Sequence, residues 1–184
     1  MKKLLIVFSI AILAACSDQK TESMKSGTDT TASTTAMTDV TYPYDIVYSS
    51  KFEMADPKYG QTILTLWKDW DNGDLSAHKD MFADSVEMHF ADGSMMHSVR
   101  DSVIVAAQTF RNMFTSAVSS VFTVTSLKST DKGENWALIW GKEIDTDKKG
   151  KVDSFYLQET WRFNKDGKTD LLYQYKAAAM PPKQ

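Results

Sequence analysis

Three side chains in this 184-residue sequence are suited to moving a proton near neutral pH: His89, His97 and Glu159. An imidazole changes its charge close to neutral pH, so a histidine inside a cavity can act as a general base. Glu159 interrupts the apolar side of an alternating segment that contains Phe155, Leu157, Trp161 and Phe163. A carboxylate on such a face must find a partner, take up a proton or take part in chemistry, because burying it bare is costly.

The strand that carries His89 decides which histidine faces inward. Val86, Met88 and Phe90 alternate with Glu87 and His89, and Asp92-Gly93 then predicts a two-residue hairpin turn. That turn places His97 opposite Met88 on the apolar side and makes it the preferred base, with Glu159 assisting. A shift of one residue in the register exchanges the two histidines, and His89 is then the candidate. The alternative is a hydrogen-bonded histidine at the rim and a structural role for Glu159.

Helical spacing and capping residues predict three helices. The first begins at Asp56-Pro57 and ends at Asn72-Gly73, and a second, shorter one follows Asp74. The sequence Ser98-Val99-Arg100-Asp101 resembles a capping box and opens the third.

Four strands are expected after the third helix, at 121–126, 136–144, 152–163 and 170–175. The turns between them are short, which favours antiparallel neighbours. The expected fold class is α+β: a curved antiparallel sheet with three helices, forming a conical α+β roll around a cavity.

Large apolar side chains on these elements could line such a cavity. The candidate ligand-binding residues are Trp70, Met88, Phe90, Phe110, Trp161 and Tyr175; core packing or dimer contacts are the alternative role for the aromatic ones. We expect no metal site, because the three histidines show no helical ligand spacing, and no cofactor, because the sequence has no glycine-rich phosphate loop.

Residues 1–15 have the features of a secretory signal: Lys2 and Lys3 precede an apolar run that is too short to span a bilayer. The run ends at Leu13-Ala14-Ala15-Cys16, which resembles the bacterial lipobox, and Cys16 is the sole cysteine. We expect Cys16 to carry acyl chains such as palmitate, with a lipid bilayer as partner and the bacterial cell envelope as location. The alternative is an ordinary signal followed by an incidental cysteine.

The segment after Cys16 is too polar to fold by itself. Twelve of the 25 residues from Ser17 to Thr41 are Ser or Thr, so residues 16–41 are expected to form the lipidated cysteine and a flexible tether. Residues 42–180 are expected to form the folded domain. The formal charge of −3 argues against nucleic acid as a partner.

The order of elements and several motifs together resemble the nuclear transport factor 2-like (NTF2-like) superfamily, which includes SnoaL-like cyclases and ketosteroid isomerases. The motifs lie at 71–75, at 81–84, at 161–163 and at 166–168, where the sequence is Asp-Gly-Lys. The similarity covers about residues 56–178 and implies a cone-shaped fold, which serves enzymes, binding modules and oligomerisation domains alike.

Three functions follow from this resemblance and the residues above. The preferred one is a membrane-tethered envelope lipoprotein whose domain binds a small hydrophobic or aromatic molecule. The second is cyclase- or isomerase-like proton transfer by His97. The third is a protein-interaction module that forms a homodimer or binds another partner through the open sheet face, where Tyr156 and Trp140 are expected.

Overall fold

The computed structural model describes residues 40–178, and its first helix has the bounds that the capping residues predict. Helix α1 (Lys58–Asn72) follows Pro57 and ends at Gly73, whose φ of 75° is in the left-handed region that favours glycine. Ile63, Leu66 and Trp67 lie on its buried face. The prediction for this helix is confirmed.

The second predicted helix is wrong. Residues 75–78 form turns, followed by one turn of 3-10 helix, η1 (Lys79–Met81). The Asp74 carboxylate accepts hydrogen bonds from the backbone N–H and the hydroxyl of Ser76, at 3.2 and 2.7 Å. This local Asp-turn geometry competes with an α-helix, so the described chain has two α-helices rather than three.

Helix α2 (Arg100–Arg111) directly follows strand β3 (Met95–Val99). The capping box predicted at Ser98 is not formed, because Ser98 belongs to the strand and Val99 occupies the N-cap position without a side-chain hydrogen bond. Val103 and Ile104 on this helix are buried.

Seven strands form one sheet in the order β1-β4-β5-β6-β7-β2-β3. Besides β3, they are β1 (Phe52–Met54), β2 (Phe82–His89), β4 (Phe114–Ser129), β5 (Asn135–Asp147), β6 (Val152–Phe163) and β7 (Thr169–Ala178). The predicted antiparallel meander from β4 to β7 is confirmed, and β1 adds an unpredicted strand at the edge.

The pairing of β2 with β7 departs from the predicted antiparallel sheet, because these two strands run parallel. Parallel neighbours need a long connection. Here the whole stretch β3–α2–β4–β5–β6 provides it. The sheet is therefore mixed, with one parallel pair among antiparallel ones.

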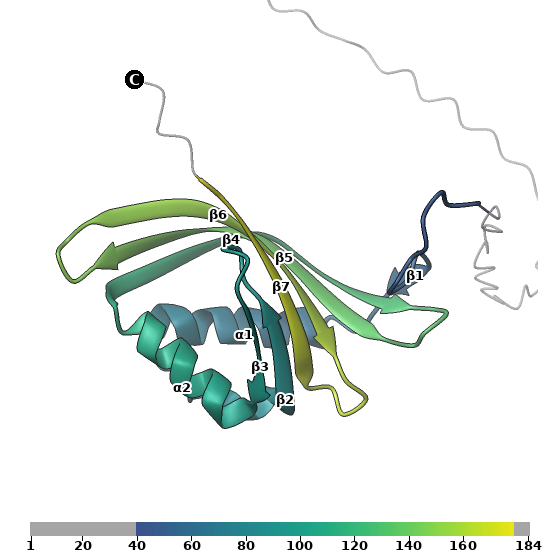
Figure 1. The fold of residues 1–184 in the computed structure, drawn as a ribbon, viewed down its shortest axis with the longest axis horizontal. Coiled ribbons are helices and arrows are strands. Elements are labelled where there is room, and N and C mark those ends of the chain that lie inside the picture. The colour runs from purple at the N-terminus through teal and green to yellow at the C-terminus, as the bar shows by residue number, and fades with distance from the viewer. Residues whose placement is uncertain (1–39, 179–184) are drawn as a thin grey trace, which may run out of the picture. The chain divides into compact units, whose positions relative to one another are not determined.

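The sheet bends strongly over the two helices (Figure 1). The register shifts in β4 near Phe114 and again near Val121, and bulges of this kind bend a strand. Helix α1 packs against β4 and β5, and α2 packs against β2 and β3. The core between the helices and the concave side includes Ile63, Trp67, Val86, Val103, Ile139, Trp161 and Leu172.

The predicted signal peptide, Cys16 and nearly all of the predicted tether lie outside the described residues. Among residues 40–178, no helix has the length and the apolar character needed to cross a bilayer.

Candidate functional site

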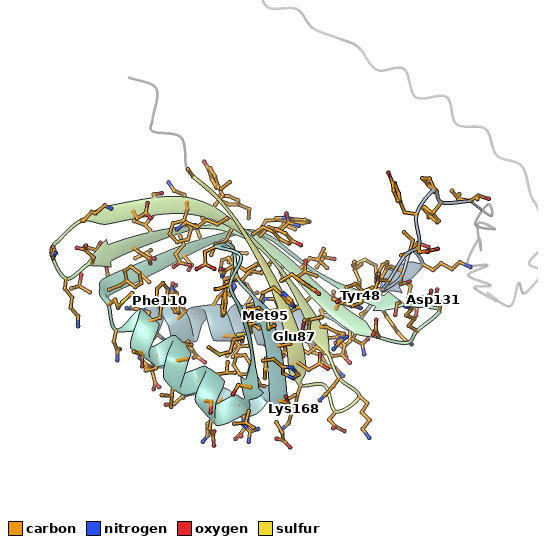
Figure 2. All side chains as sticks on the ribbon, viewed as in Figure 1. Tyr48, Glu87, Met95, Phe110, Asp131 and Lys168 are labelled. Atoms are coloured by element: carbon orange, nitrogen blue, oxygen red, sulfur yellow. The ribbon has the colours of Figure 1, made fainter. Side chains whose placement is uncertain are left out.

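A cavity of about 590 Å³ lies between the helices and the concave side of the sheet. Its walls are mostly apolar, and five of the six predicted ligand-binding side chains line it: Trp70, Met88, Phe90, Phe110 and Trp161. Figure 2 labels Phe110, which projects from α2 on the concave side of the sheet. Their role in binding stays a prediction.

Glu159, on β6, is the carboxyl group with the most donors in the cavity wall. Its Oε2 accepts hydrogen bonds from Trp67 Nε1 at 2.6 Å and Trp161 Nε1 at 2.9 Å, and its Oε1 accepts one from Gln174 Nε2 at 2.8 Å. Burial raises the pKa of Glu159, and these three neutral donors oppose that rise. The structure thus gives this carboxyl group three fixed partners.

Two more acids line the same cavity from β5. Glu143 and Asp145 are two residues apart, so both side chains point to the inner face of the strand, and they are only 6% and 4% exposed. Trp70 donates its indole N–H to Glu143 Oε1 at 2.9 Å. Helix α1 therefore supplies an indole donor to Glu143 through Trp70, and one to Glu159 through Trp67.

The two β5 carboxyl groups influence each other's protonation. Burial, followed by the charge of Asp145, raises the pKa of Glu143 to about 8, and burial also raises the pKa of Asp145. Two carboxylates this close cannot both ionise cheaply. At neutral pH the pair therefore holds a proton, placed on Glu143.

Asp153 and Lys176 complete the polar part of the lining. Asp153 pairs with Asp145 across β5 and β6. Lys176 Nζ lies 3.6 Å from Asp153 Oδ2 and 3.4 Å from the centre of the Phe155 ring. Both charged side chains are partly exposed, so this pair marks the solvent side of the cavity.

Arg111 fixes the end of α1 that carries Trp70. It is 6% exposed, and its guanidinium donates to the backbone carbonyls of Trp70, Asp71 and Phe114 at 2.6, 3.1 and 3.2 Å. Carbonyls at a helix C-terminus have no partners within the helix, and a cation satisfies them. Arg111 thereby positions the donor to Glu143.

Solved structures with the same architecture place this domain in a known fold class. An NTF2-like protein from Exiguobacterium sp. 255-15 is 15% identical over 63% of this chain and 98% of its own, with a TM-score of 0.51. The chain has the NTF2-like fold. No protein-family model and no curated protein matches the sequence.

Two enzymes share this NTF2-like fold. IdmH, a putative polyketide cyclase from Streptomyces antibioticus, is 14% identical over 65% of this chain and 91% of its own, at a TM-score of 0.50. SalBIII, an epoxide hydrolase/cyclase-like enzyme in pyran ring formation of salinomycin, is 10% identical over the same shares, also at 0.50. These likenesses establish the fold and leave the activity to the site.

The predicted position of His97 in the NTF2-like cavity is wrong. The β2–β3 hairpin has a three-residue loop, in which Phe90 N–H donates to Ser94 O, and Glu87 rather than Met88 pairs with His97. His97 therefore points away from the cavity, is exposed, and lies 3.1 Å from Ser85 Oγ. The geometry offers no support for His97 as a base.

His89 does not enter the cavity either. Its Nε2 lies 2.6 Å from Glu87 Oε1, and its ring stacks on Tyr173 with the centres 4.5 Å apart. Compared with the predicted register, β3 is shifted by one residue along β2, while the side chains of β2 keep their predicted faces. Met96 therefore lies opposite Met88 and lines the cavity, and no histidine does so from this hairpin. Both histidines lie on the outer face of the sheet.

Tyr175 lies on the outer face as well, contrary to its predicted place in the NTF2-like cavity. Residues alternate along β7, so Gln174 and Lys176 line the cavity while Tyr175 lines a separate outer hollow with Phe122, Trp140 and Tyr156.

Sequence reasoning missed Glu143, Asp145 and Gln174. The signal for the two acids was present, because they continue the odd-numbered series of buried residues Ala137, Ile139 and Gly141 on β5. Among the described residues, no group of three or more acids, histidines and cysteines could hold a metal ion.

Proposed function

We propose that the protein is an envelope lipoprotein whose NTF2-like domain binds a small hydrophobic or aromatic molecule. The observation that carries this proposal is the cavity of about 590 Å³ with walls that are mostly apolar. Sites for small organic ligands commonly have this size and this composition, with a few polar groups that set the orientation. Glu143, Asp145 and Glu159 are the polar groups here.

Uptake of the neutral dye N-phenyl-1-naphthylamine by the mature chain tests this function. We expect a fluorescence increase that saturates at one dye per domain. Ala107→Phe fills the cavity from α2 and should abolish the increase, whereas Val105→Phe, at a position of the same helix that is 66% exposed, should leave it intact. Failure of the wild-type chain to take up the dye, or equal uptake by both variants, would contradict the proposal.

Membrane attachment through Cys16 forms the other part of the proposal. It is supported by the sequence around the sole cysteine. Acyl chains add about 0.8 kcal/mol per buried CH₂, so two or more chains hold a protein at a bilayer without any membrane-spanning helix. Labelled palmitate should enter the wild-type protein and not Cys16→Ser, and only the wild type should sediment with membranes. Membrane attachment of Cys16→Ser would overturn this part.

A second candidate function is proton transfer in the same cavity, with the Glu143–Asp145 pair in place of His97. A carboxyl pair that holds one proton near neutral pH can act as acid and base. The probe is 2-tetralone in D₂O, followed by NMR. Exchange of its α-protons above the buffer rate, lost in Glu143→Gln, supports this candidate; a rate equal to that of buffer rejects it.

The outer face also suits the homodimer that the sequence predicts. Phe122, Trp140, Tyr156 and Tyr175 are each at least 37% exposed there, and we propose that a second copy covers them. Sedimentation should show a dimer that Tyr156→Glu converts to a monomer and that Lys149→Glu, in an exposed turn, does not change. A monomeric wild type would contradict this interface.

A further inference from the structure

The groups that line the cavity offer more hydrogen-bond acceptors than donors. The ionisable ones are the acids Asp92, Glu143, Asp145, Asp153 and Glu159, together with a single base, Lys176. Glu159 already has three donors. The carboxyl oxygens that lack hydrogen-bond donors therefore belong mainly to Glu143 and Asp145.

Asp145 is the least satisfied of these acids. It is 96% buried, lines the cavity, and its Oδ1 has no hydrogen-bond partner among the described residues. Among the same residues, Glu143 accepts one hydrogen bond, from the Trp70 indole at Oε1. A buried carboxylate without donors is costly. A ligand that donates hydrogen bonds to it therefore removes this cost and binds more tightly.

The two cations nearest to this pair are engaged elsewhere. Arg111 directs its N–H groups at three backbone carbonyls, and Lys176 pairs with Asp153 while its ammonium lies over the Phe155 ring. They lower the pKa of Asp145 without donating to it. A ligand cation is free to take the position that these side chains leave open.

We infer that the cavity selects a hydrophobic amine: a compact apolar or aromatic body with one protonated amino group, whose N–H donors meet Asp145 and Glu143. This inference rests on the proposed binding function and adds the chemical class of the ligand. The aromatic walls suit both ends of such a molecule. Trp70, Phe114 and Phe155 line the cavity with the two acids, and aromatic faces attract ammonium groups. A carboxylate or phosphate ligand would meet like charges.

Binding of the amine is coupled to a proton. The pKa of Glu143 is about 8, so at pH 7 the ammonium displaces a proton from the carboxyl pair. Affinity for the amine therefore rises as pH increases through about 8, and falls only where the amine itself loses its charge. Three further titratable groups act on the pair: Glu159 and Asp153 from β6 and Lys176 from β7.

Three ligands of one shape test the inference: 1-naphthylmethylamine, 1-naphthylmethanol and 1-naphthoic acid, titrated calorimetrically into the mature chain. We expect the amine to bind at least about tenfold more tightly than the alcohol, which corresponds to about 1.4 kcal/mol, because hydrogen bonds between charged groups are stronger than those of a neutral hydroxyl. The acid should bind most weakly. Heats measured in two buffers should report proton release for the amine alone.

Isosteric variants assign the preference to the carboxyl pair. In Glu143→Gln and in Asp145→Asn, the affinity for the amine should fall to within about threefold of the affinity for the alcohol, and the alcohol should still bind. The reason is the loss of one charged hydrogen bond, which contributes about tenfold in affinity. Glu87→Gln, which removes a carboxylate from the outer face, should change nothing.

The outcomes separate this inference from the function on which it rests. If the neutral dye binds but the amine binds no better than the alcohol, the amine inference fails and the binding function stands. If neither the dye nor any naphthalene compound binds, both fail. A preference for the amine that persists in Asp145→Asn and Glu143→Gln also overturns the assignment to this pair.

Discussion

At the scale of single residues, Glu159 shows how a carboxyl group is kept in an apolar wall. Two indole N–H groups and one amide surround it with donors, so each oxygen has a partner. An amide in its place would turn an N–H₂ group toward at least one of these donors and leave it unpaired.

Glu159→Gln should therefore lower the free energy of unfolding by about 1–3 kcal/mol, the cost of a buried donor without an acceptor. Urea denaturation measures it. Glu53→Gln, at an exposed carboxylate on β1, is the matched control and should stay close to the wild type. A Glu159→Gln protein as stable as the wild type would show that the three hydrogen bonds contribute little.

The Glu143–Asp145 pair predicts how stability depends on pH. The pKa of Glu143 is raised from 4.5 to about 8 in the folded state, so the folded protein holds a proton that the unfolded chain releases. This contribution is fully present below about pH 4.5 and is lost as pH rises through about 8. The midpoint of thermal unfolding should fall across this range and fall less in Glu143→Gln. An equal pH slope in both proteins would contradict the assignment.

Alternation alone was enough to predict Glu159 as a special residue, because apolar neighbours flank it on both sides in β6. It was not extended to β5, where Glu143 lay inside the predicted strand at 136–144 and Asp145 lay one residue beyond the expected end. Strand β5 continues to Asp147, so both acids lie inside the sheet. The boundary error of three residues therefore excluded Asp145 alone, whereas Glu143 was overlooked inside the predicted strand.

At the scale of elements, one extra loop residue moved one predicted site residue, His97, away from the cavity. Asp92-Gly93 is compatible with a two-residue or a three-residue hairpin loop, and in both Gly93 takes the positive φ, here 85°. The longer loop moves His97 from the inner face to the outer face. Figure 2 labels Glu87 and Met95, which belong to the two strands of this hairpin. In this register Met96, opposite Met88, lines the cavity in place of His97.

Arg111 links α2 to α1, and its geometry predicts that lysine cannot replace it. A lysine ammonium lacks the planar fork that reaches three carbonyls at once. Arg111→Lys should lower the free energy of unfolding by about 2–3 kcal/mol, in line with the loss of hydrogen bonds to a charged group. Urea denaturation tests it beside Lys79→Met, at a surface lysine that is about half exposed. Equal stability of Arg111→Lys and the wild type would contradict this capping role.

At the scale of the whole domain, the meander was predictable, whereas the pairings of β1 with β4 and of β2 with β7 were not. Turn residues and alternation define the meander from β4 to β7. They carry no information on the parallel partner of β2, which lies some 80 residues along the chain at β7. The fold class was accessible because the motifs resemble NTF2-like proteins, whereas the chemistry of the cavity depends on which side chains this chain places there.

The proposed function requires a small hydrophobic molecule to occupy the concave cavity of this domain. The most direct measurement is an NMR experiment on the mature chain with ¹³C-methyl methionine, in which contacts between methyl groups and bound 1-naphthylmethanol are recorded. Met88 and Met96 line the cavity, whereas Met95, next to Met96 on β3, is 59% exposed on the opposite face. We predict contacts to Met88 and Met96 and none to Met95. Contacts to Met95 alone, or to no methionine at saturating ligand, would contradict binding in the cavity.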